Sequence, residues 1–179
     1  ETGAGEGTTL DVTTITHKAG LNGIGLIGYN DLTGQMTSYR EVMAKQGQAE
    51  VTTDRSLITY NAHGFLKTYH DVITDTATDV TKAIDWTADF ADGYNDEGQL
   101  THYEETKLEQ AAGYQITVTT TRSGITYNNE GQMTGYAEDV QKDDSVLAQS
   151  SSDVHTIRTA TTYTTLGLLK YYADEITYL

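Results

Sequence analysis

The stretch YNNEGQMTGYAEDV, residues 127–140, recurs in closely related form four more times in this 179-residue chain. The other copies are YNDLTGQMTSYREV from Tyr29, YNAHGFLKTYHDV from Tyr60, YNDEGQLTHYEET from Tyr94 and YTTLGLLKYYADEI from Tyr163. The opening tyrosines are 31, 34, 33 and 36 residues apart, a spacing typical of tandem repeats. Since a catalytic motif is seldom copied five times, we interpret the string as a building block.

Each copy keeps the same residue types at fixed distances from a glycine. Two residues after this glycine stands Met or Leu, and seven residues after it stands an acidic residue. Five residues after it stands a tyrosine in every copy. The glycines are Gly34, Gly64, Gly98, Gly131 and Gly167, and the tyrosines are Tyr39, Tyr69, Tyr103, Tyr136 and Tyr172.

Each copy predicts a β-hairpin. A run rich in Thr, Val and Ile, such as VTTDRSLITY, precedes the opening tyrosine, and a second run follows the glycine. The Asn-x-x-Gly between them fits a three-residue loop, a type I turn followed by Gly at positive φ. We therefore expect an all-β fold in which five antiparallel hairpins, residues 29–179, form a continuous meander or solenoid-like sheet. Whether that sheet is open, sandwiched or closed is left undecided.

The predicted loop also fixes which residues face each other across the hairpin. Counting outward from it places an arginine opposite an acidic residue in three of the copies. Opposite charges in this arrangement stabilise a ladder by about 0.2–1 kcal/mol each. The predicted structural ion pairs are Arg55–Asp71, Arg122–Glu138 and Arg158–Asp174.

Strict alternation would divide each hairpin into two faces. It places Ile58, Tyr60 and Leu66 on an apolar face, and Arg55, Tyr69 and Asp71 on a polar one. A row of tyrosines on the polar face could stack sugar rings or dock a partner, because Tyr has an apolar face and a polar tip. Alternatively, each tyrosine covers its neighbour across the strands. The candidate binding residues are Tyr39, Tyr69, Tyr103, Tyr136 and Tyr172.

The third copy departs from this charge pattern. In the predicted register Asp89 takes the arginine position and faces Glu105, with Asp92 close by. Opposed like charges are destabilising, and a hard cation with oxygen ligands, calcium above all, would neutralise them. Asp89, Asp92 and Glu105 are therefore a candidate metal site. The alternatives are a shifted hairpin, or a compensating charge from Lys82 or Lys107.

Composition argues against several functions. The net charge of −15 and pI of about 4.4 disfavour binding to nucleic acid or an anionic membrane. The absence of cysteine excludes disulfides and thiolate chemistry, and the sequence has no Gly-x-Ser-x-Gly. The five histidines share no repeat position, and no apolar run reaches the ~20 residues of a spanning helix. We expect no enzyme, no membrane insertion and no cofactor besides the calcium candidate.

Residues 1–28 form a separate Gly/Thr-rich segment. It contains the β-prone stretch TTLDVTTITH without an evident partner hairpin, so we expect a strand that could pair with a neighbouring subunit. The last copy closes near residue 179, and both a segment of a longer array and a complete subunit remain open.

The repeated string resembles two known repeat families. YNNEGQMT and YNDEGQLT resemble the tyrosine-aspartate repeats of Rhs-type and teneurin-like proteins, with Asn in place of Asp and Gln in place of Arg. This resemblance covers all five copies and implies β-hairpins wound into a large, non-catalytic extracellular shell or scaffold. GQMTGY is similar to glucan- and choline-binding wall repeats, although those depend on tryptophans and this chain has only Trp86.

Two functions are therefore expected from different classes. The first is a non-catalytic structural segment of a secreted or cell-surface protein, a stalk, shell or filament subunit. It would associate through β-strands with copies of itself or with flanking repeats. The alternative is a carbohydrate-binding or adhesin module that uses the row of tyrosines.

Overall fold

A computed structural model describes residues 13–17, 27–45, 49–144 and 152–179, and these residues contain eleven β-strands and no helix. The expectation of an all-β fold is confirmed. The strands are β1 (Thr13–His17), β2 (Ile27–Tyr29), β3 (Met36–Lys45), β4 (Val51–Tyr60), β5 (Leu66–Asp75), β6 (Val80–Thr87), β7 (Tyr103–Ala111), β8 (Tyr114–Tyr127), β9 (Met133–Asp144), β10 (Ser152–Tyr163) and β11 (Leu169–Tyr178).

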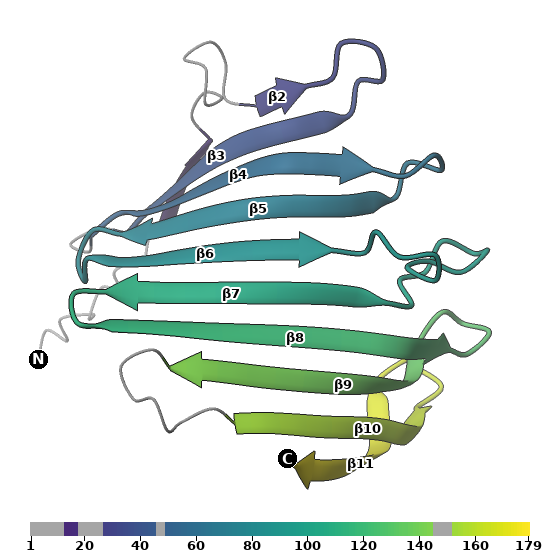
Figure 1. Cartoon of the computed structure of the whole chain (residues 1–179). Helices are drawn as coiled ribbons and strands as arrows, with labels where there is room; N and C mark the ends of the chain where they lie inside the picture. Colours follow the sequence, from purple (N-terminus) through teal and green to yellow (C-terminus); the bar gives the residue numbers. More distant parts are fainter. Residues whose placement is uncertain (1–12, 18–26, 46–48, 145–151) are drawn as a thin grey trace, which may run out of the picture.

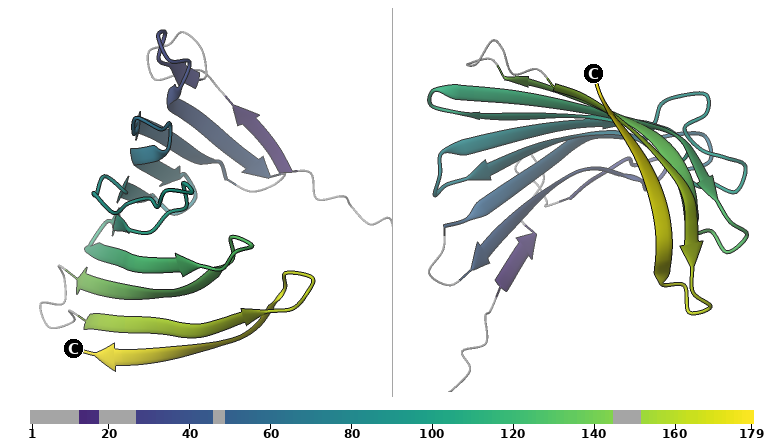
Figure 2. Two further views of the ribbon diagram at one scale, coloured as in Figure 1. Left: turned by 90° about the vertical axis from the view of Figure 1, so that its right-hand side faces the viewer. Right: turned by 90° about the horizontal axis from the view of Figure 1, so that it is seen from below.

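The strands form one antiparallel sheet in the order β1-β3-β4-β5-β6-β7-β8-β9-β10-β11, with β2 also paired to β3. From β3 onward each strand therefore pairs with its neighbours in sequence, which confirms the predicted meander. All five repeat loops lie along one side of the sheet (Figure 1). The sheet twists and curves but stays open (Figure 2).

Four of the repeat loops have the predicted three-residue form, and the loop of the first copy, residues 31–34, is one residue longer. Their five glycines have φ between 70° and 84°, the region that Gly adopts at least cost. In the second copy the Gly64 N–H donates to the Asn61 carbonyl at 3.0 Å, and Asn61 and Phe65 close the hairpin through backbone and side-chain bonds. Tyr60 pairs with Leu66 and Arg55 with Asp71, as the loop predicts.

Between those pairs, however, the hairpin contains two β-bulges. One extra residue lies on β4 around Leu57, and Lys67 is the extra residue on β5. The same position before the opening tyrosine has positive φ in three copies, at Leu57, Gly124 and Ala160. The two insertions compensate, which preserves the register of the ion pair. They break strict alternation between Arg55 and Ile58, so the predicted division into an apolar and a polar face does not hold across the bulges.

The first strand pairs within its own chain. Thr13–His17 of β1 pairs with Lys45–Glu41 of β3, and β2 pairs with the other part of β3. Residues 13–17 thus have a partner strand in their own chain, and pairing of this stretch with a neighbouring subunit stays a prediction. The other residues of the predicted segment, 1–12 and 18–26, lie outside the described part of the chain.

Few side chains of the described residues are deeply buried, because a single sheet has no second layer to cover it. Ile58 and Ile125 are 5% and 6% exposed, and Thr161 stands at the same repeat position with 9% exposure. Cohesion must therefore come mainly from contacts between neighbouring side chains on the sheet.

Candidate functional site

Nine side chains form a continuous stack across the sheet, one from each strand from β3 to β11. We call this stack the ladder. It consists of arginines and one tryptophan placed between tyrosines, in the order Tyr39, Arg55, Tyr69, Trp86, Tyr103, Arg122, Tyr136, Arg158 and Tyr172. It contains all five tyrosines that the sequence indicates as candidate binding residues.

The distances along the ladder are those of ring stacking and of cation–π contacts. The Arg55 Cζ lies 3.7 Å from the ring centre of Tyr69, and Tyr69 stacks on Trp86 with centroids 5.4 Å apart. In the fourth and fifth copies Arg122 lies 4.2 Å and Arg158 lies 5.2 Å from the ring of Tyr136. Each contact of this type contributes about 0.5–2 kcal/mol, depending on how far it is removed from water.

Each ladder arginine also binds a carboxylate. Arg55 donates from Nε to Asp71 Oδ1 and from Nη2 to Asp71 Oδ2, both at 2.6 Å. Arg158 binds Asp174 through the same two pairs of atoms, both at 2.7 Å. Arg122 donates from Nε to Glu138 at 2.8 Å. All three predicted arginine–carboxylate pairs are thus present. Two-point binding fixes the guanidinium plane, and this holds the cation over the tyrosine rings.

These pairs shift the pKa of their members. The side-chain hydrogen bond to Asp71 raises the pKa of Arg55, and the bond from Arg158 lowers the pKa of Asp174. Burial raises the pKa of Tyr69 and of Tyr103 above that of a free phenol. Arg55 therefore stays a cation near neutral pH, and Tyr69 and Tyr103 stay neutral there.

The third copy fills the ladder with Trp86, not with the acidic residue that the sequence register predicts. Trp86 pairs with Glu105 and stacks on Tyr69 and on Tyr103. The prediction that Asp89 faces Glu105 is wrong, because β6 ends at Thr87 and the connection to β7 is lengthened. In the third copy Glu105 follows its partner Trp86 by 19 residues, whereas in the second copy Asp71 follows its partner Arg55 by 16.

The three carboxylates of the candidate metal site are engaged separately. Asp89 pairs with Lys67 at 2.7 Å, and Glu105 pairs with Lys107 at 2.6 Å. Asp92 lies 3.0 Å from His102 Nδ1. Within the described residues no group of three or more His, Cys, Asp or Glu side chains could hold a metal ion. The compensating charge at Glu105 comes from Lys107, one of the two lysines considered from the sequence, while Lys82 pairs with Glu109.

The opening tyrosines of the third, fourth and fifth copies are each bonded to the preceding copy. The hydroxyl groups of Tyr94, Tyr127 and Tyr163 donate at 2.6 Å to the carbonyls of Leu66, Leu100 and Met133, respectively. Each acceptor is the residue two positions after the loop glycine. The repeated tyrosine and the repeated Met or Leu position therefore form one contact between copies.

The loops also contact one another from copy to copy. The side chain after each loop glycine lies over the glycine of the next loop, so Gln99 lies over Gly131 and Gln132 over Gly167. The same glutamine accepts a bond from the loop asparagine, as Asn128 Nδ2 donates to Gln132 Oε1 at 2.8 Å. A hollow of about 340 Å³ between the second and third loops is lined partly by Phe65, which replaces the glutamine there. The residues of the repeated string thus form contacts between neighbouring hairpins.

The ladder shifts along the strands from one hairpin to the next. Tyr39, Arg55 and Asp71 lie in one row, but the ladder continues from Arg55 to Tyr69, two residues before Asp71 on β5. The same step occurs from Arg122 to Tyr136 and from Arg158 to Tyr172. The stack therefore runs obliquely across the sheet.

Comparisons with protein-family models, curated proteins and solved structures give no match. The resemblance to tyrosine-aspartate repeats and to wall repeats stays a prediction. A search of the described residues finds no helix with the length and apolarity needed to cross a membrane.

Proposed function

We propose that this chain is a non-catalytic structural repeat segment of a secreted or cell-surface protein, a scaffold or spacer built by adding hairpins side by side. The observation that carries the proposal is that the repeated residues contact the neighbouring copy. The opening tyrosine, the residue after the loop glycine and the ladder tyrosine each do so. Residues repeated in order to bind a ligand would instead converge on a shared cleft.

The positions of the ladder rings favour this role over carbohydrate binding. Tyr69 is flanked by Arg55 and Trp86, and Tyr136 is flanked by Arg122 and Arg158. A sugar stacks on an open ring face, and these faces are already used within the sheet. The resemblance to extracellular repeats supports a location at the cell surface or outside the cell, and the acidic composition fits it.

A duplication of one repeat tests the scaffold role. Inserting a second copy of residues 116–151 directly after residue 151 adds one 36-residue period and two strands. The expected product is a folded protein with unchanged circular dichroism per residue. In small-angle X-ray scattering its longest dimension should be greater, because two strands add roughly 9–10 Å to the width of a sheet.

The matched control carries Ala at the inserted equivalents of Arg122 and Tyr136, which removes the ladder contacts of the new copy. This control should unfold at lower urea concentration than the intact duplication. Equal stability of the two proteins, or an unfolded duplication, would contradict the proposal. Antibody labelling of intact source cells checks the location, and a glycan array checks the alternative function.

A further inference from the structure

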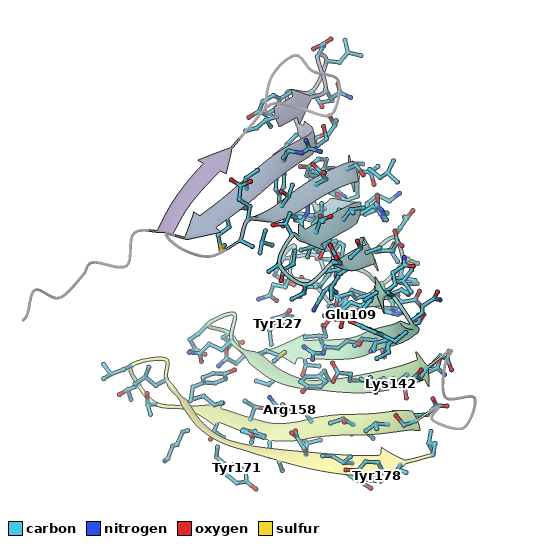
Figure 3. The ribbon with its side chains drawn as sticks, turned by 90° about the vertical axis from the view of Figure 1, so that its left-hand side faces the viewer. Glu109, Tyr127, Lys142, Arg158, Tyr171 and Tyr178 are labelled. Atoms are coloured by element: carbon cyan, nitrogen blue, oxygen red, sulfur yellow. The ribbon has the colours of Figure 1, made fainter. Side chains whose placement is uncertain are left out.

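The two ends of the sheet differ in how far they are covered. β3 is covered by β1 and β2, whereas β11 pairs only with β10 among the described strands. Tyr172 of β11 is 45% exposed, while Tyr136 at the same repeat position is 9% exposed. Leu169, Ile176 and Tyr178 are also exposed, and Figure 3 shows Tyr171 and Tyr178 projecting at this edge.

β11 carries one half of each contact that joins neighbouring copies. Tyr172 has Arg158 on one side at 4.0 Å, whereas Tyr136 has an arginine on both sides. Leu169 is equivalent to Leu66, Leu100 and Met133, whose carbonyls accept a hydrogen bond from the opening tyrosine of the next copy. Leu168 occupies the repeat position that follows the loop glycine. In the other copies the side chain at this position lies over the glycine of the next loop.

The missing halves define the chemistry of the partner. A partner that completes these contacts must place a cation or a large aromatic ring on the open face of Tyr172. It must also place a hydroxyl donor at the Leu169 carbonyl. In this chain one arginine-bearing strand supplies both groups, because Arg122 and Tyr127 stand five residues apart on β8. That arginine also needs its own carboxylate, which the returning strand of the same hairpin supplies through Glu138. A hairpin therefore satisfies every group, and a single strand does not.

We propose that the outer edge of β11 binds an arginine-bearing repeat hairpin of this same kind. The inference rests on the proposed scaffold function and identifies its partner. By analogy with the pair Tyr136–Arg158, the partner arginine lies opposite Tyr172. For the hairpin of β8 and β9, this register sets Thr120 opposite Asp174, Val118 opposite Ile176 and Ile116 opposite Tyr178.

This register accounts for the apolar side chains on β11. It covers Ile176 and Tyr178 with β-branched aliphatic residues, as Val154 meets Val140 between β9 and β10. A second copy of the present chain is a poorer donor, since the leading strands of its four complete hairpins, β4, β6, β8 and β10, are each paired on both sides. It would have to pair through β11 itself, and that is an outcome which the experiment distinguishes.

The test uses the full chain and a fluorescently labelled synthetic peptide of residues 116–144, with binding measured by anisotropy. We expect saturable binding and slower amide hydrogen exchange confined to β11. Peptide Arg122→Ala and protein Tyr172→Ala should each weaken binding about tenfold, the effect of one cation–π contact. Peptide Tyr127→Phe should weaken it about fivefold, the effect of one hydrogen bond.

Two controls keep the result specific. Tyr172→Phe retains the ring and should bind like wild type, and Tyr39→Ala removes the tyrosine at the other end of the ladder and should also bind like wild type. Binding that ignores Arg122→Ala and Tyr172→Ala, or protection on strands other than β11, would overturn the inference. So would sedimentation data showing a dimer that buries β11 and excludes the peptide. A stable duplication protein together with absent peptide binding would sink this inference alone and leave the scaffold function standing.

Discussion

The third copy builds the ladder from different residues than the second, fourth and fifth copies do. The second, fourth and fifth copies place an arginine between two tyrosines and bind it to a carboxylate. The third copy places Trp86 there and leaves Glu105 to Lys107. What is repeated is thus a flat group that presents two faces to tyrosine rings. The charge can be carried elsewhere, whereas the stacking cannot.

The largest expected loss follows removal of a ladder arginine. Arg55→Ala would leave Asp71, which is 4% exposed, as a buried carboxylate without its cation. Breaking a buried pair in this way costs about 3–5 kcal/mol. Urea unfolding should show this loss. The matched control is Arg40→Ala, which breaks the pair with Asp54 at a more exposed site and should cost about 0–1 kcal/mol. Equal losses would mean that the ladder position is not special.

Substitutions at Trp86 test whether stacking or charge is required. Trp86→Ala removes the contacts with both tyrosines and should cost about 2–3 kcal/mol, less than a fully buried Trp because the site is half-buried. Trp86→Arg restores the arrangement of the other copies and should stay within about 1 kcal/mol of wild type. Thermal unfolding ranks the two variants. An arginine variant as unstable as the alanine variant would show that the third copy depends on the indole itself.

The loop glycines give a graded comparison. Gly34→Ala places an L-residue at φ 70° with no neighbour near its Cβ, and should cost about 1–2 kcal/mol from the backbone alone. Gly98→Ala has the same backbone cost and also drives the new methyl group into the ring of Phe65. It should therefore be the less stable variant in urea unfolding. The reverse order would mean that Phe65 moves aside freely.

One buried position is expected to improve. Thr161 takes the place of Ile58 and Ile125, and within the described residues its hydroxyl has no hydrogen-bond partner. Thr161→Ile removes this unsatisfied group and should stabilise the fold by about 1 kcal/mol, seen as a higher urea midpoint. Ile125→Thr is the matched reverse change and should destabilise. A loss in Thr161→Ile would indicate that the fifth copy has less room at this site.

The smallest expected effect concerns pH. The bond from Arg158 lowers the pKa of Asp174, so the folded carboxyl holds its proton less strongly than the unfolded one. Its stabilising contribution is therefore fully present above the ordinary carboxyl pKa of about 4 and is lost as the pH falls through the lowered folded value. Melting curves of wild type and Asp174→Asn should differ near neutral pH and converge in strong acid. A difference that grows in acid would reverse the sign of this argument.

The sequence is sufficient to predict the hairpins, their loops and three ion pairs, because these depend on local turn chemistry and on counting across one loop. It does not reveal the bulges at Leu57 and Lys67, because two compensating insertions leave the outer register unchanged. It misplaces the third ladder residue for a related reason, since the lengthened connection after Thr87 moves the register. Trp86 could have been found by its side-chain chemistry, because it is the one aromatic residue in the β-prone run Val80–Thr87.

The pairing of β1 with β3 was beyond sequence reasoning for another reason. The short strand β2 pairs only with residues 36–39 of β3, and β1 pairs with residues 41–45. A segment distant in the sequence thus completes the pairing of the first hairpin. Nothing in the composition of Thr13–His17 distinguishes a partner in the same chain from one in another. Only the lengths of the neighbouring strands decide between them.

The two-residue step of the ladder sets the shape of any longer assembly. Each hairpin moves the stack by about 7 Å along the strands for every ~10 Å across them. Successive units are therefore displaced along the strands as well as across them, and the twist of the sheet also rotates each unit relative to the one before it (Figure 2). The number of units in a chain would fix the angle between whatever is attached at its two ends, not merely their separation, and gaining or losing one unit would reorient both.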